Sequence, residues 1–456
     1  MKLGVVILAA GLGKRMQSSL PKVLHPLAGR PLLDHVLETA RGLAAEAIVI
    51  VHGHGGELVR ERLADADCRW VVQHPQLGTG HAVMQALPIV NDMDRILILY
   101  GDVPLITVAT LQRLLEASAE TALGILTAEL ADPTGYGRIL RDPSGRVTGI
   151  VEQRDASPAQ QAITEINSGF LVAERARLET WLSQVGNDNR QGEYYLTDIT
   201  ALAAREGVTI ATVQPSRLAE ISGVNDRVQL ATLERDYQQQ AAERLMRAGV
   251  TLADPTRFDL RGRLHVEQDV SIDINCVIEG EVWLAEGVQI GPGCVLKDCR
   301  IGRGTQISAH SIIEGALVGA EARIGPFARL RPRTQLADRT HVGNFVELKQ
   351  TQLGTGSKAN HLSYLGDAEI GADVNIGAGT ITCNYDGANK WQTTIERGAF
   401  IGSNSALVAP VRIGADATIG AGSVIARDAP AAELTLTRAK QATIPGWQRP
   451  KKRPTP

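Results

Sequence analysis

A run of glycine and basic residues follows the first apolar segment of the chain. Directly after Val5–Leu8 and two alanines come two glycines and three basic residues: Gly11, Gly13, Lys14, Arg15 and Lys22. Glycine lets backbone N–H groups approach an anion closely, and the basic side chains add positive charge. Met16 replaces the third glycine of a dinucleotide fingerprint, and the spacing of a P-loop is absent. The run therefore suits a polyphosphate; the alternative is a tight strand-to-helix turn with solvated basic residues.

A carboxylate ends a second apolar segment. Ile96–Tyr100 is followed by Gly101 and Asp102. Carboxylate oxygens together with substrate phosphates can hold a hard cation such as Mg²⁺. A helix cap or a turn is the alternative role for a single aspartate at a strand end. Further polar or glycine positions stand beside apolar runs, and each alone also has a turn or cap explanation: Gln73, Gly78, Thr79, Gly137, Glu152, Asn167 and Asn225.

His361 stands in the second half of the chain, in register with Arg331, Lys349 and Tyr364. An amine must lose a proton to attack a thioester, and imidazole titrates in the range that suits a general base. The cationic side chains suit a sugar phosphate beside that base. A hydrogen-bonded structural role is the alternative for a single histidine. We also consider Glu347 as the group that orients His361.

The first 225 residues alternate short β-branched runs with helical patterns. The predicted strands are Val5–Leu8, Ala47–Val51, Trp70–Gln73, Ile96–Tyr100 and Leu123–Thr127. Strands that alternate with helices predict an α/β domain with a mainly parallel, Rossmann-like sheet covered by helices on both faces. Ligands of such sheets bind outside the carboxyl ends of the strands, which is where the polar residues above are found.

Residues 266–425 carry an aliphatic residue at about every sixth position. The clearest run is Ile401, Leu407, Ile413, Ile419 and Ile425. Neither a helix nor a free strand has this period, so it predicts a β-solenoid of hexapeptide repeats whose aliphatic residues stack into one core. The period stops over Cys383–Phe400, which we predict to be a loop that leaves the solenoid as a lid or an intersubunit arm. The flat faces of a solenoid also favour side-by-side association of copies.

A helical period joins the two halves. Leu230, Leu233, Tyr237, Ala241 and Leu245 recur at three and four residues, with Asn225 or Asp226 as the candidate cap. The predicted organisation is a nucleotide-binding domain over 1–226, a linker helix over 227–249 and a solenoid domain over 250–456 whose tail begins near 439.

The composition is that of an ordinary globular protein. The chain has 456 residues, a formal net charge of −3, 44% hydrophobic and 21% charged residues. Such a charge favours neither nucleic acid nor an anionic membrane, so small molecules or further copies are the expected partners. Five cysteines without a CxxC pair, no signal-like start and no apolar run of membrane length indicate a cytoplasmic protein. We interpret His52-Gly53-His54 as a loop and the basic tail 449–456 as a solvated terminus.

Eight short motifs in the first half resemble those of the sugar-nucleotide pyrophosphorylases. In order they are LAAGLGKRM, PKVL, QLGTGHA, YGDVPL, TGYGRI, GIVEQRD, EINSG and GEYYLTD. With the solenoid, the chain resembles the bifunctional family that joins an N-acetylglucosamine-1-phosphate uridylyltransferase to a glucosamine-1-phosphate N-acetyltransferase and makes UDP-N-acetylglucosamine. The resemblance implies UTP and acetyl-CoA as co-substrates, Mg²⁺, a left-handed parallel β-helix and a homotrimer formed through it.

The resemblance also assigns uridylyltransferase residues. The uridine nucleotide would contact Leu8, Ala9, Ala10, Gly11, Gln73, Gly78, Thr79, Tyr100 and Gly101, with Arg15 and Lys22 on its phosphates. Gly137, Glu152 and Asn167 would hold the sugar, and Asp102 with Asn225 would hold Mg²⁺. Lys14 departs from the small hydroxyl residue usual in the family.

In the acetyltransferase, His361 would be the catalytic base. The sugar phosphate would contact Arg331, Lys349, Tyr364, Asn375, Asn384 and Tyr385, and acetyl-CoA would lie along Ala378, Ser403, Ala421 and Arg438. Asn360 stands where the family more often has a smaller residue. A single-activity pyrophosphorylase whose solenoid only assembles or regulates it, and a structural trimer with a vestigial nucleotide domain, are the two alternatives.

Overall fold

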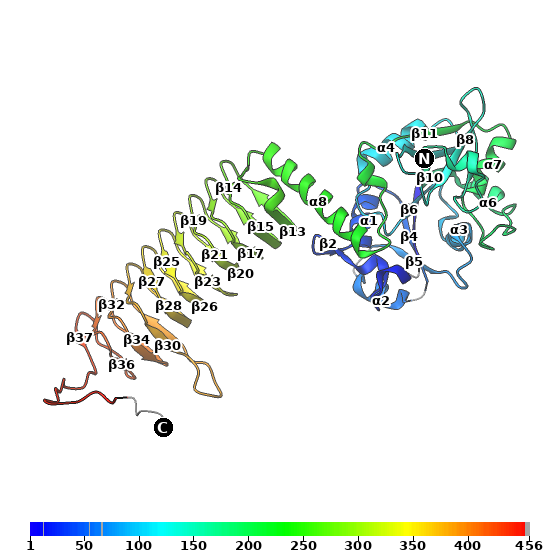
Figure 1. Ribbon diagram of the computed structural model, residues 1–456. Helices are drawn as coiled ribbons and strands as arrows, with labels where there is room; N and C mark the ends of the chain where they lie inside the picture. The colour runs from blue at the N-terminus through cyan, green and yellow to red at the C-terminus, as the bar shows by residue number, and fades with distance from the viewer. Residues whose placement is uncertain (12, 54, 65–66, 452–456) are drawn as a thin grey trace. The chain divides into compact units, whose positions relative to one another are not determined.

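The computed structural model describes residues 1–11, 13–53, 55–64 and 67–451, with the side chain of Lys14 outside the description. His54, which was predicted to lie in a loop, and most of the predicted basic tail fall outside the described residues. The chain forms two compact units, Met1–Tyr237 and Gln238–Pro456 (Figure 1). Helix α8 (Arg227–Arg247) supplies residues to both.

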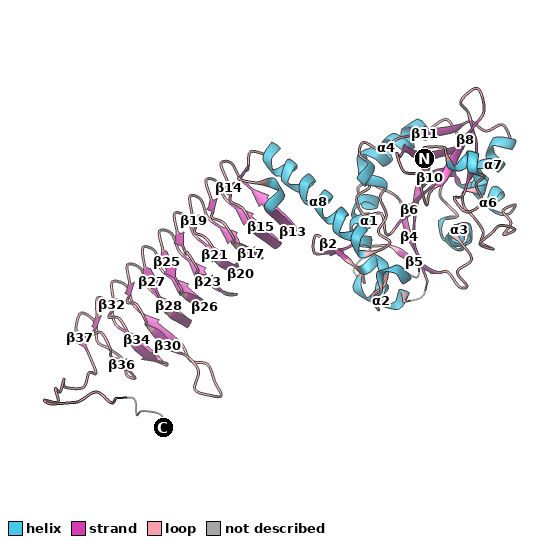
Figure 2. Ribbon diagram, viewed as in Figure 1, coloured by secondary structure: helices cyan, strands magenta, loops and turns pink. Residues whose placement is uncertain are grey.

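The first unit is built on a mixed nine-stranded sheet with helices on both faces (Figure 2). The main strand order is β11-β7-β10-β6-β1-β4-β5, and β10 runs antiparallel to both of its neighbours. The predicted Rossmann-like class is confirmed. The strands of this sheet are β1 Leu3–Ala9, β4 Ala47–His52, β5 Arg69–Val72, β6 Arg95–Tyr100, β7 Leu123–Glu129, β8 Gly137–Arg141, β9 Val147–Val151, β10 Glu165–Glu174 and β11 Ile210–Val213.

Alternation along the buried strands divides the core between the two faces of this sheet. Val6 and Leu8 of β1 pack in one cluster with helices α3, α6 and α7, whereas Val5 and Ile7 pack in the other with α1, α2 and α4. Successive side chains of a strand point to opposite faces, so an uninterrupted apolar run serves both clusters. The helices are α1 Leu32–Arg41, α2 Gly56–Arg62, α3 Thr79–Ala86, α4 Val108–Ala117, α5 Pro158–Gln161, α6 Arg175–Leu182 and α7 Asp198–Arg205.

Short elements complete the first unit. A small hairpin pairs β2 (Pro26–Leu27) with β3 (Arg30–Pro31). The 3₁₀ helices of this unit, among the described residues, are η1 Lys14–Met16, η2 Lys22–Leu24, η3 Leu87–Val90 and η4 Leu218–Ile221, and the second unit has η5 Pro255–Arg257. The prediction of a loop is wrong for His52, which is the last residue of β4. Its ring packs edge-on against Trp70, with 5.8 Å between the ring centroids.

The second unit is a solenoid of short parallel strands stacked coil upon coil (Figure 1). Ile272, Ile290, Ile307, Ile324 and Val342 are paired in register and buried, as the six-residue period predicts. One sheet contains β12 Thr251–Leu252, β14 Ser271–Ile272, β16 Gln289–Ile290, β19 Gln306–Ile307, β22 Arg323–Ile324, β25 His341–Asn344, β27 Lys358–His361, β29 Asn375–Ile376, β32 Phe400–Ile401, β35 Thr418–Ile419 and β37 Leu434–Thr435.

The other solenoid sheet has fifteen strands and completes the walls of the coils. It contains β13 Phe258–Val266, β15 Cys276–Leu284, β17 Val295–Lys297, β18 Arg300–Ile301, β20 Ile312–Glu314, β21 Leu317–Val318, β23 Arg329–Leu330, β24 Gln335–Leu336, β26 Glu347–Leu353, β28 Tyr364–Ile370, β30 Ile381–Cys383, β31 Thr393–Ile395, β33 Ala406–Val408, β34 Val411–Ile413 and β36 Val424–Ile425.

The predicted loop over Cys383–Phe400 is too long. Strand β31 falls inside it, pairs with β28 and β34, and buries Thr393 and Ile395. Ile395 stands six residues before Ile401, so the pattern resumes one hexapeptide repeat earlier than predicted. The excursion is residues 384–392, closed by a bridge between Tyr385 and Lys390.

The start of the solenoid is covered by α8. The buried carboxamide of Gln238 donates to the carbonyl of Leu260 at 2.9 Å and accepts from its N–H at 2.7 Å. This side chain therefore makes the two hydrogen bonds that a neighbouring strand would make to Leu260, which protects the first coil.

Candidate functional site

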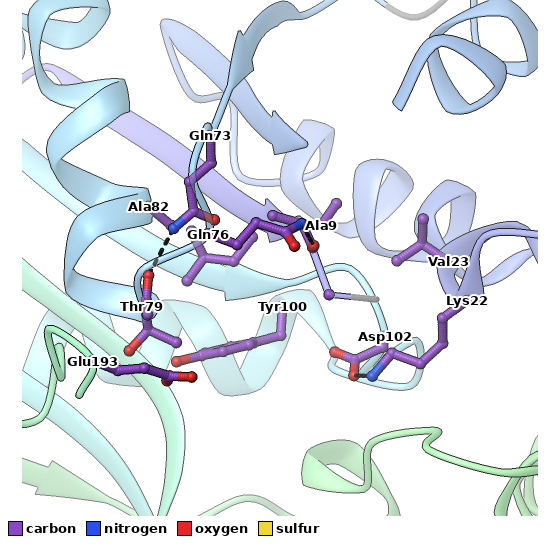
Figure 3. Close-up of a pocket in the computed structure, with 14 residues that line it drawn as sticks. Ala9, Lys22, Val23, Gln73, Gln76, Thr79, Ala82, Tyr100, Asp102 and Glu193 are labelled. Atoms are coloured by element: carbon purple, nitrogen blue, oxygen red, sulfur yellow. Dashed lines mark hydrogen bonds and ion pairs between the residues drawn. The ribbon is translucent and has the colours of Figure 1, made fainter. Parts of the chain in front are cut away.

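A cavity of about 350 Å³ opens beyond the carboxyl ends of β1 and β6 (Figure 3). The predicted metal ligand Asp102 lines it together with nine of the residues predicted for the nucleotide: Leu8, Ala9, Ala10, Gly11, Lys22, Gln73, Gly78, Thr79 and Tyr100. Sequence reasoning missed four others: Val23, Gln76, Ala82 and Glu193. The predicted Gly101 is buried beside the cavity, where a Cβ would lie 3.1 Å from Leu33 and 3.3 Å from Ala9.

The wall of this cavity opposite β1 depends on close backbone packing. A Cβ on Gly78, whose φ is +104°, would lie 2.7 Å from the carbonyl oxygen of Tyr194. The N–H of Gly80 donates to that same oxygen at 2.8 Å, and Thr79 Oγ1 accepts from the N–H of Leu196 at 3.1 Å. These contacts bring the segment that carries Glu193 against the start of α3. The GEYYLTD motif was the cue in the sequence for this segment.

Gln73 and Gln76 fix the loop between β5 and α3. The buried Gln73 donates its amide to the carbonyl of Gly78 at 2.9 Å. The amide of Gln76 donates to the carbonyl of Ala10, which ties this loop to the glycine run after β1. Met16, the residue in place of a third glycine, is buried in a small apolar cluster with Leu27 and Leu32. It therefore anchors the glycine run instead of approaching a ligand.

The residues predicted for the sugar gather around β8, β9 and β10. Gly137 is paired with Asn167, and a Cβ on Gly137 would lie 3.5 Å from both carboxylate oxygens of Glu152. Burial raises the pKa of Glu152, and the Thr197 hydroxyl, which donates to it at 2.9 Å, acts in the opposite direction. One donor leaves acceptor capacity on this carboxyl for a sugar hydroxyl.

Tyr100 is the last residue of β6, and its hydroxyl lies within the electrostatic reach of Glu152 and Asp102. Burial raises the pKa of its hydroxyl, and the negative charges of Glu152 and Asp102 raise it further. The hydroxyl therefore stays protonated at neutral pH and can act as a hydrogen-bond donor.

Asp102 and Asn225, the predicted metal ligands, are brought together. The N–H of Val224 donates to the carbonyl of Asp102 at 2.9 Å. Asp226 caps α8, because its carboxylate accepts from the N–H groups of Val228 and Gln229 at 3.0 and 2.9 Å. The Asn225 side chain therefore does not serve as the cap. Arg15, predicted on the phosphates, is exposed in η1 and is not among the residues that line the cavity.

In the second unit, His361 is the last residue of β27 and stands at the corner of the solenoid before β28. Ala378, Ser403 and Ala421 occupy the same position of successive coils. This register follows from the hydrogen bonds of the next residue in each coil, because Gly379 N–H donates to the His361 carbonyl, Asn404 N–H to that of Ala378 and Gly422 N–H to that of Ser403. Arg438 continues the row, since a Cβ on Gly420 would lie 3.6 Å from its guanidinium. His361, Ala378, Ser403 and Ala421 thus form one track across successive coils, and Arg438 lies at its end.

A cationic group lies around the same corner on the next wall. Arg331 and Lys349 stand in adjacent coils, directly after the paired Leu330 and Leu348. The ammonium of Lys390, from the excursion, lowers the pKa of Lys349 because the two positive charges face each other. Lys390 was not among the predicted site residues, although the sequence placed it in the excursion.

Tyr364 and Asn384 meet above Gly366. A Cβ on Gly366 would lie 2.4 Å from the Tyr364 hydroxyl and 2.8 Å from the Asn384 amide nitrogen. Asn384 also donates to the buried carboxylate of Asp367. Tyr385, by contrast, is exposed and donates to the carbonyl of Gly387 at 2.6 Å. Asn375 is half-buried in β29, in register with Lys358.

The suggestion that Glu347 orients His361 is wrong for the described residues. Glu347 accepts a hydrogen bond from the Arg331 guanidinium at 2.9 Å and has no hydrogen bond with His361 in this part of the chain. Glu347 begins β26 in one solenoid sheet, whereas His361 ends β27 in the other.

Comparison with known proteins finds relatives for both halves of the chain. Residues 5–157 match the MobA-like NTP transferase domain, residues 260–355 the GMPPB C-terminal domain, and residues 392–427 six bacterial transferase hexapeptide repeats. The bifunctional protein GlmU of Azoarcus sp. is 59% identical over 98% of this chain and 99% of its own. Those of Alkalilimnicola ehrlichii and Nitrosospira multiformis are 58% and 56% identical, over 97% and 99% of their lengths.

The chain belongs to the GlmU family of bifunctional proteins. It is a bifunctional transferase, a uridylyltransferase joined to a hexapeptide acetyltransferase. The predicted family and the predicted bifunctional activity are confirmed, and the single-activity and purely structural alternatives are wrong. In the part of the chain that the structure describes, no helix is long and apolar enough to cross a membrane.

Proposed function

We propose that the second unit transfers the acetyl group of acetyl-CoA to the amine of glucosamine-1-phosphate. The first unit then transfers uridylyl from UTP to N-acetylglucosamine-1-phosphate and releases pyrophosphate and UDP-N-acetylglucosamine. Residues 1–226 and 250–456 are the two domains, 227–249 is the linker helix, and the solenoid is left-handed. The observation that carries this assignment is the track from His361 to Ala421, with Arg438 at its end, together with the cationic group of Arg331, Lys349 and Lys390.

In the uridylyl transfer, a phosphate oxygen of the sugar phosphate forms a bond to the α-phosphorus of UTP while the bond to pyrophosphate breaks. Alignment and charge neutralisation dominate such a reaction, so no covalent nucleophile is needed. Gly11 and Gly78 admit the nucleotide, Arg15 and Lys22 contact its phosphates, and Tyr100 donates from the cavity wall. The Glu152 carboxylate accepts hydrogen bonds from the sugar hydroxyls, and the Asn167 amide donates to them.

The oxygen donors near Lys22 fit Mg²⁺. Asp102 offers a carboxylate and Asn225 a carbonyl oxygen, and a single ammonium already contacts both. Mg²⁺ in such sites takes one or two protein oxygens and completes its shell with phosphates and water. When bound, it would neutralise charge on the transferring phosphoryl group, while Asp102 and Asn225 hold it in place.

In the acetyl transfer, His361 accepts a proton from the amine as nitrogen attacks the thioester carbonyl, and CoA leaves as its thiolate. Arg331, Lys349 and Lys390 hold the phosphate of the sugar, and Tyr364, Asn375 and the pair Asn384-Tyr385 contact the sugar or its surroundings. The small side chains of Ala378, Ser403 and Ala421 let CoA lie flat along the coils, and Arg438 meets its far end.

An exposed apolar ladder runs along the corner next to His361, which supports assembly of a trimer through the solenoid. His310, Phe327 and Phe345 stack at centroid distances of 5.1 and 5.3 Å, and the exposed Leu362 continues the row. Such a stripe is costly to leave in water. The acetyl-transfer site lies directly beside it, so a neighbouring copy would complete that site. The protein is proposed to act in the cytoplasm.

Phe345→Asp should therefore convert the trimer to monomers in sedimentation velocity, because a charge cannot be buried in this ladder without a partner. The rate of acetyl transfer should fall because the trimer is lost, and the rate of uridylyl transfer should stay the same. Val228→Asp on α8, where the valine is 77% exposed, is the matched control and should leave the sedimentation unchanged. A trimeric Phe345→Asp protein would contradict this assignment.

Lys390→Met should raise the KM for glucosamine-1-phosphate about tenfold, the effect of losing one charged contact to a phosphate. Lys349 should then also keep its proton to higher pH, since the ammonium that lowers its pKa is gone. In the unmodified protein the KM should begin to rise with pH before an ordinary lysine titrates, and in Lys390→Met this rise should shift to higher pH. Lys297→Met, which breaks a solenoid ion pair with Glu279, is the control and should change neither property.

The whole assignment is tested by incubating the purified chain with glucosamine-1-phosphate, acetyl-CoA, UTP and Mg²⁺. Free CoA thiol and UDP-N-acetylglucosamine are measured separately, and both should form. UDP-sugar formation from ready-made N-acetylglucosamine-1-phosphate without any CoA release from glucosamine-1-phosphate would overturn the acetyl-transfer half.

A further inference from the structure

Lys22 lies between the glycine run and the proposed metal ligands. It begins η2, directly after Pro21, and its side chain is only 12% exposed. Its stem passes over Gly13, where an added Cβ would lie 2.8 Å from the Cβ of Lys22 and where φ is +57°. Glycine at position 13 therefore leaves room for the lysine stem, and the side chain extends from there toward Asp102 (Figure 3).

The ammonium of Lys22 contacts both proposed metal ligands. It forms an ion pair with Oδ2 of Asp102 and lies 3.4 Å from Oδ1 of Asn225. The hydrogen bond from Val224 to the Asp102 carbonyl keeps the two ligands close to each other. One lysine nitrogen thus bridges the two oxygens that a Mg²⁺ ion would need.

An ammonium and a divalent cation cannot share these oxygens. Repulsion between the two positive charges is strong at contact distance, and Mg²⁺ gives up its water shell reluctantly. A polyphosphate changes the balance because its negative charges attract both cations. The lysine side chain is flexible and carries a compact charge, so it can turn from a carboxylate to a nearby phosphate.

We infer that Lys22 is an exchangeable counter-ion that closes the metal site until a nucleotide arrives. In the nucleotide-free chain its ammonium neutralises Asp102, and nucleotide phosphates draw it away and leave Asp102 and Asn225 to the metal. Metal and nucleotide then bind with positive coupling, and this coupling is reciprocal. The inference rests on the proposed function, because it takes Asp102 and Asn225 as the metal ligands.

The test measures Mn²⁺ binding to the full-length protein without nucleotide, by the electron paramagnetic resonance signal of free Mn²⁺. Lys22→Met keeps most of the stem and removes the charge, and it should bind Mn²⁺ about tenfold more tightly than the unmodified chain. Lys22→Arg retains a cation and should bind as weakly as the unmodified chain. Lys2→Met, a remote lysine of the same unit, should change nothing. Adding Asp102→Asn to Lys22→Met should abolish the gain.

Two results would overturn the inference. One is equal Mn²⁺ affinity in Lys22→Met and the unmodified chain. The other is a gain in Mn²⁺ affinity from Lys22→Met that persists when Asp102→Asn is added. Failure of the proposed function has a different signature, namely metal-dependent uridylyl transfer that persists in Asp102→Asn.

Discussion

Replacing His361 by alanine is expected to abolish acetyl transfer and to leave uridylyl transfer intact. His361 is exposed at a solenoid corner, at the head of the track formed by Ala378, Ser403 and Ala421. Loss of a general base typically lowers a rate by about 10²- to 10⁴-fold. The measurement is release of free CoA thiol from acetyl-CoA with glucosamine-1-phosphate, alongside pyrophosphate release from UTP with N-acetylglucosamine-1-phosphate.

The control for this variant is His265→Ala. His265 is also a solenoid histidine, but it stacks on Trp283 at 3.7 Å in the first coils. Its loss should leave acetyl transfer close to the level of the unmodified chain. If His361→Ala lost both activities together, the residue would have a folding role instead of a catalytic one.

Asp102→Asn has the second large expected effect. The substitution keeps the volume and removes the charge that would hold the metal, so uridylyl transfer should fall by about 10²-fold or more. Added Mg²⁺ or Mn²⁺ should restore little of it. Pyrophosphate release as a function of metal concentration is the measurement, and acetyl transfer should be unchanged because His361 and its surroundings lie in the other unit.

Asp92→Asn provides the matched control for Asp102→Asn, because Asp92 is exposed near the opposite end of β6. It should preserve both activities and their dependence on metal. Near-normal uridylyl transfer in Asp102→Asn would remove this carboxylate from the site.

The fold could be predicted well where one period controls burial. The six-residue spacing predicted the solenoid because each aliphatic residue stacks on its equivalent in the next coil. Strand β31 was missed since only Ile395 carries the pattern there, after a nine-residue excursion. The antiparallel strand β10 was also missed, because an apolar run buried on both faces gives no sign of its direction.

The sites were predictable where a residue type is tied to a motif. Asp102 and the glycines of the first loop could be found in this way. Gln76 and Glu193 also lie within quoted motifs, but their places in the cavity wall could not be predicted, because these depend on how the segments before α3 and around Tyr194 pack together. The cation of Lys390 faces Lys349 across a loop, and the pairing of Glu347 with Arg331 depends on side-chain direction, which spacing alone does not give.

The central claim is that two independent transferase sites occupy the two units of one chain. It is tested most directly by giving Asp102→Asn and His361→Ala the same mixture of glucosamine-1-phosphate, acetyl-CoA, UTP and Mg²⁺ and separating the products. Asp102→Asn should release CoA and accumulate N-acetylglucosamine-1-phosphate, whereas His361→Ala should form UDP-N-acetylglucosamine only when N-acetylglucosamine-1-phosphate is supplied. Failure of Asp102→Asn to release CoA, or failure of His361→Ala to form UDP-N-acetylglucosamine from supplied N-acetylglucosamine-1-phosphate, would contradict the claim.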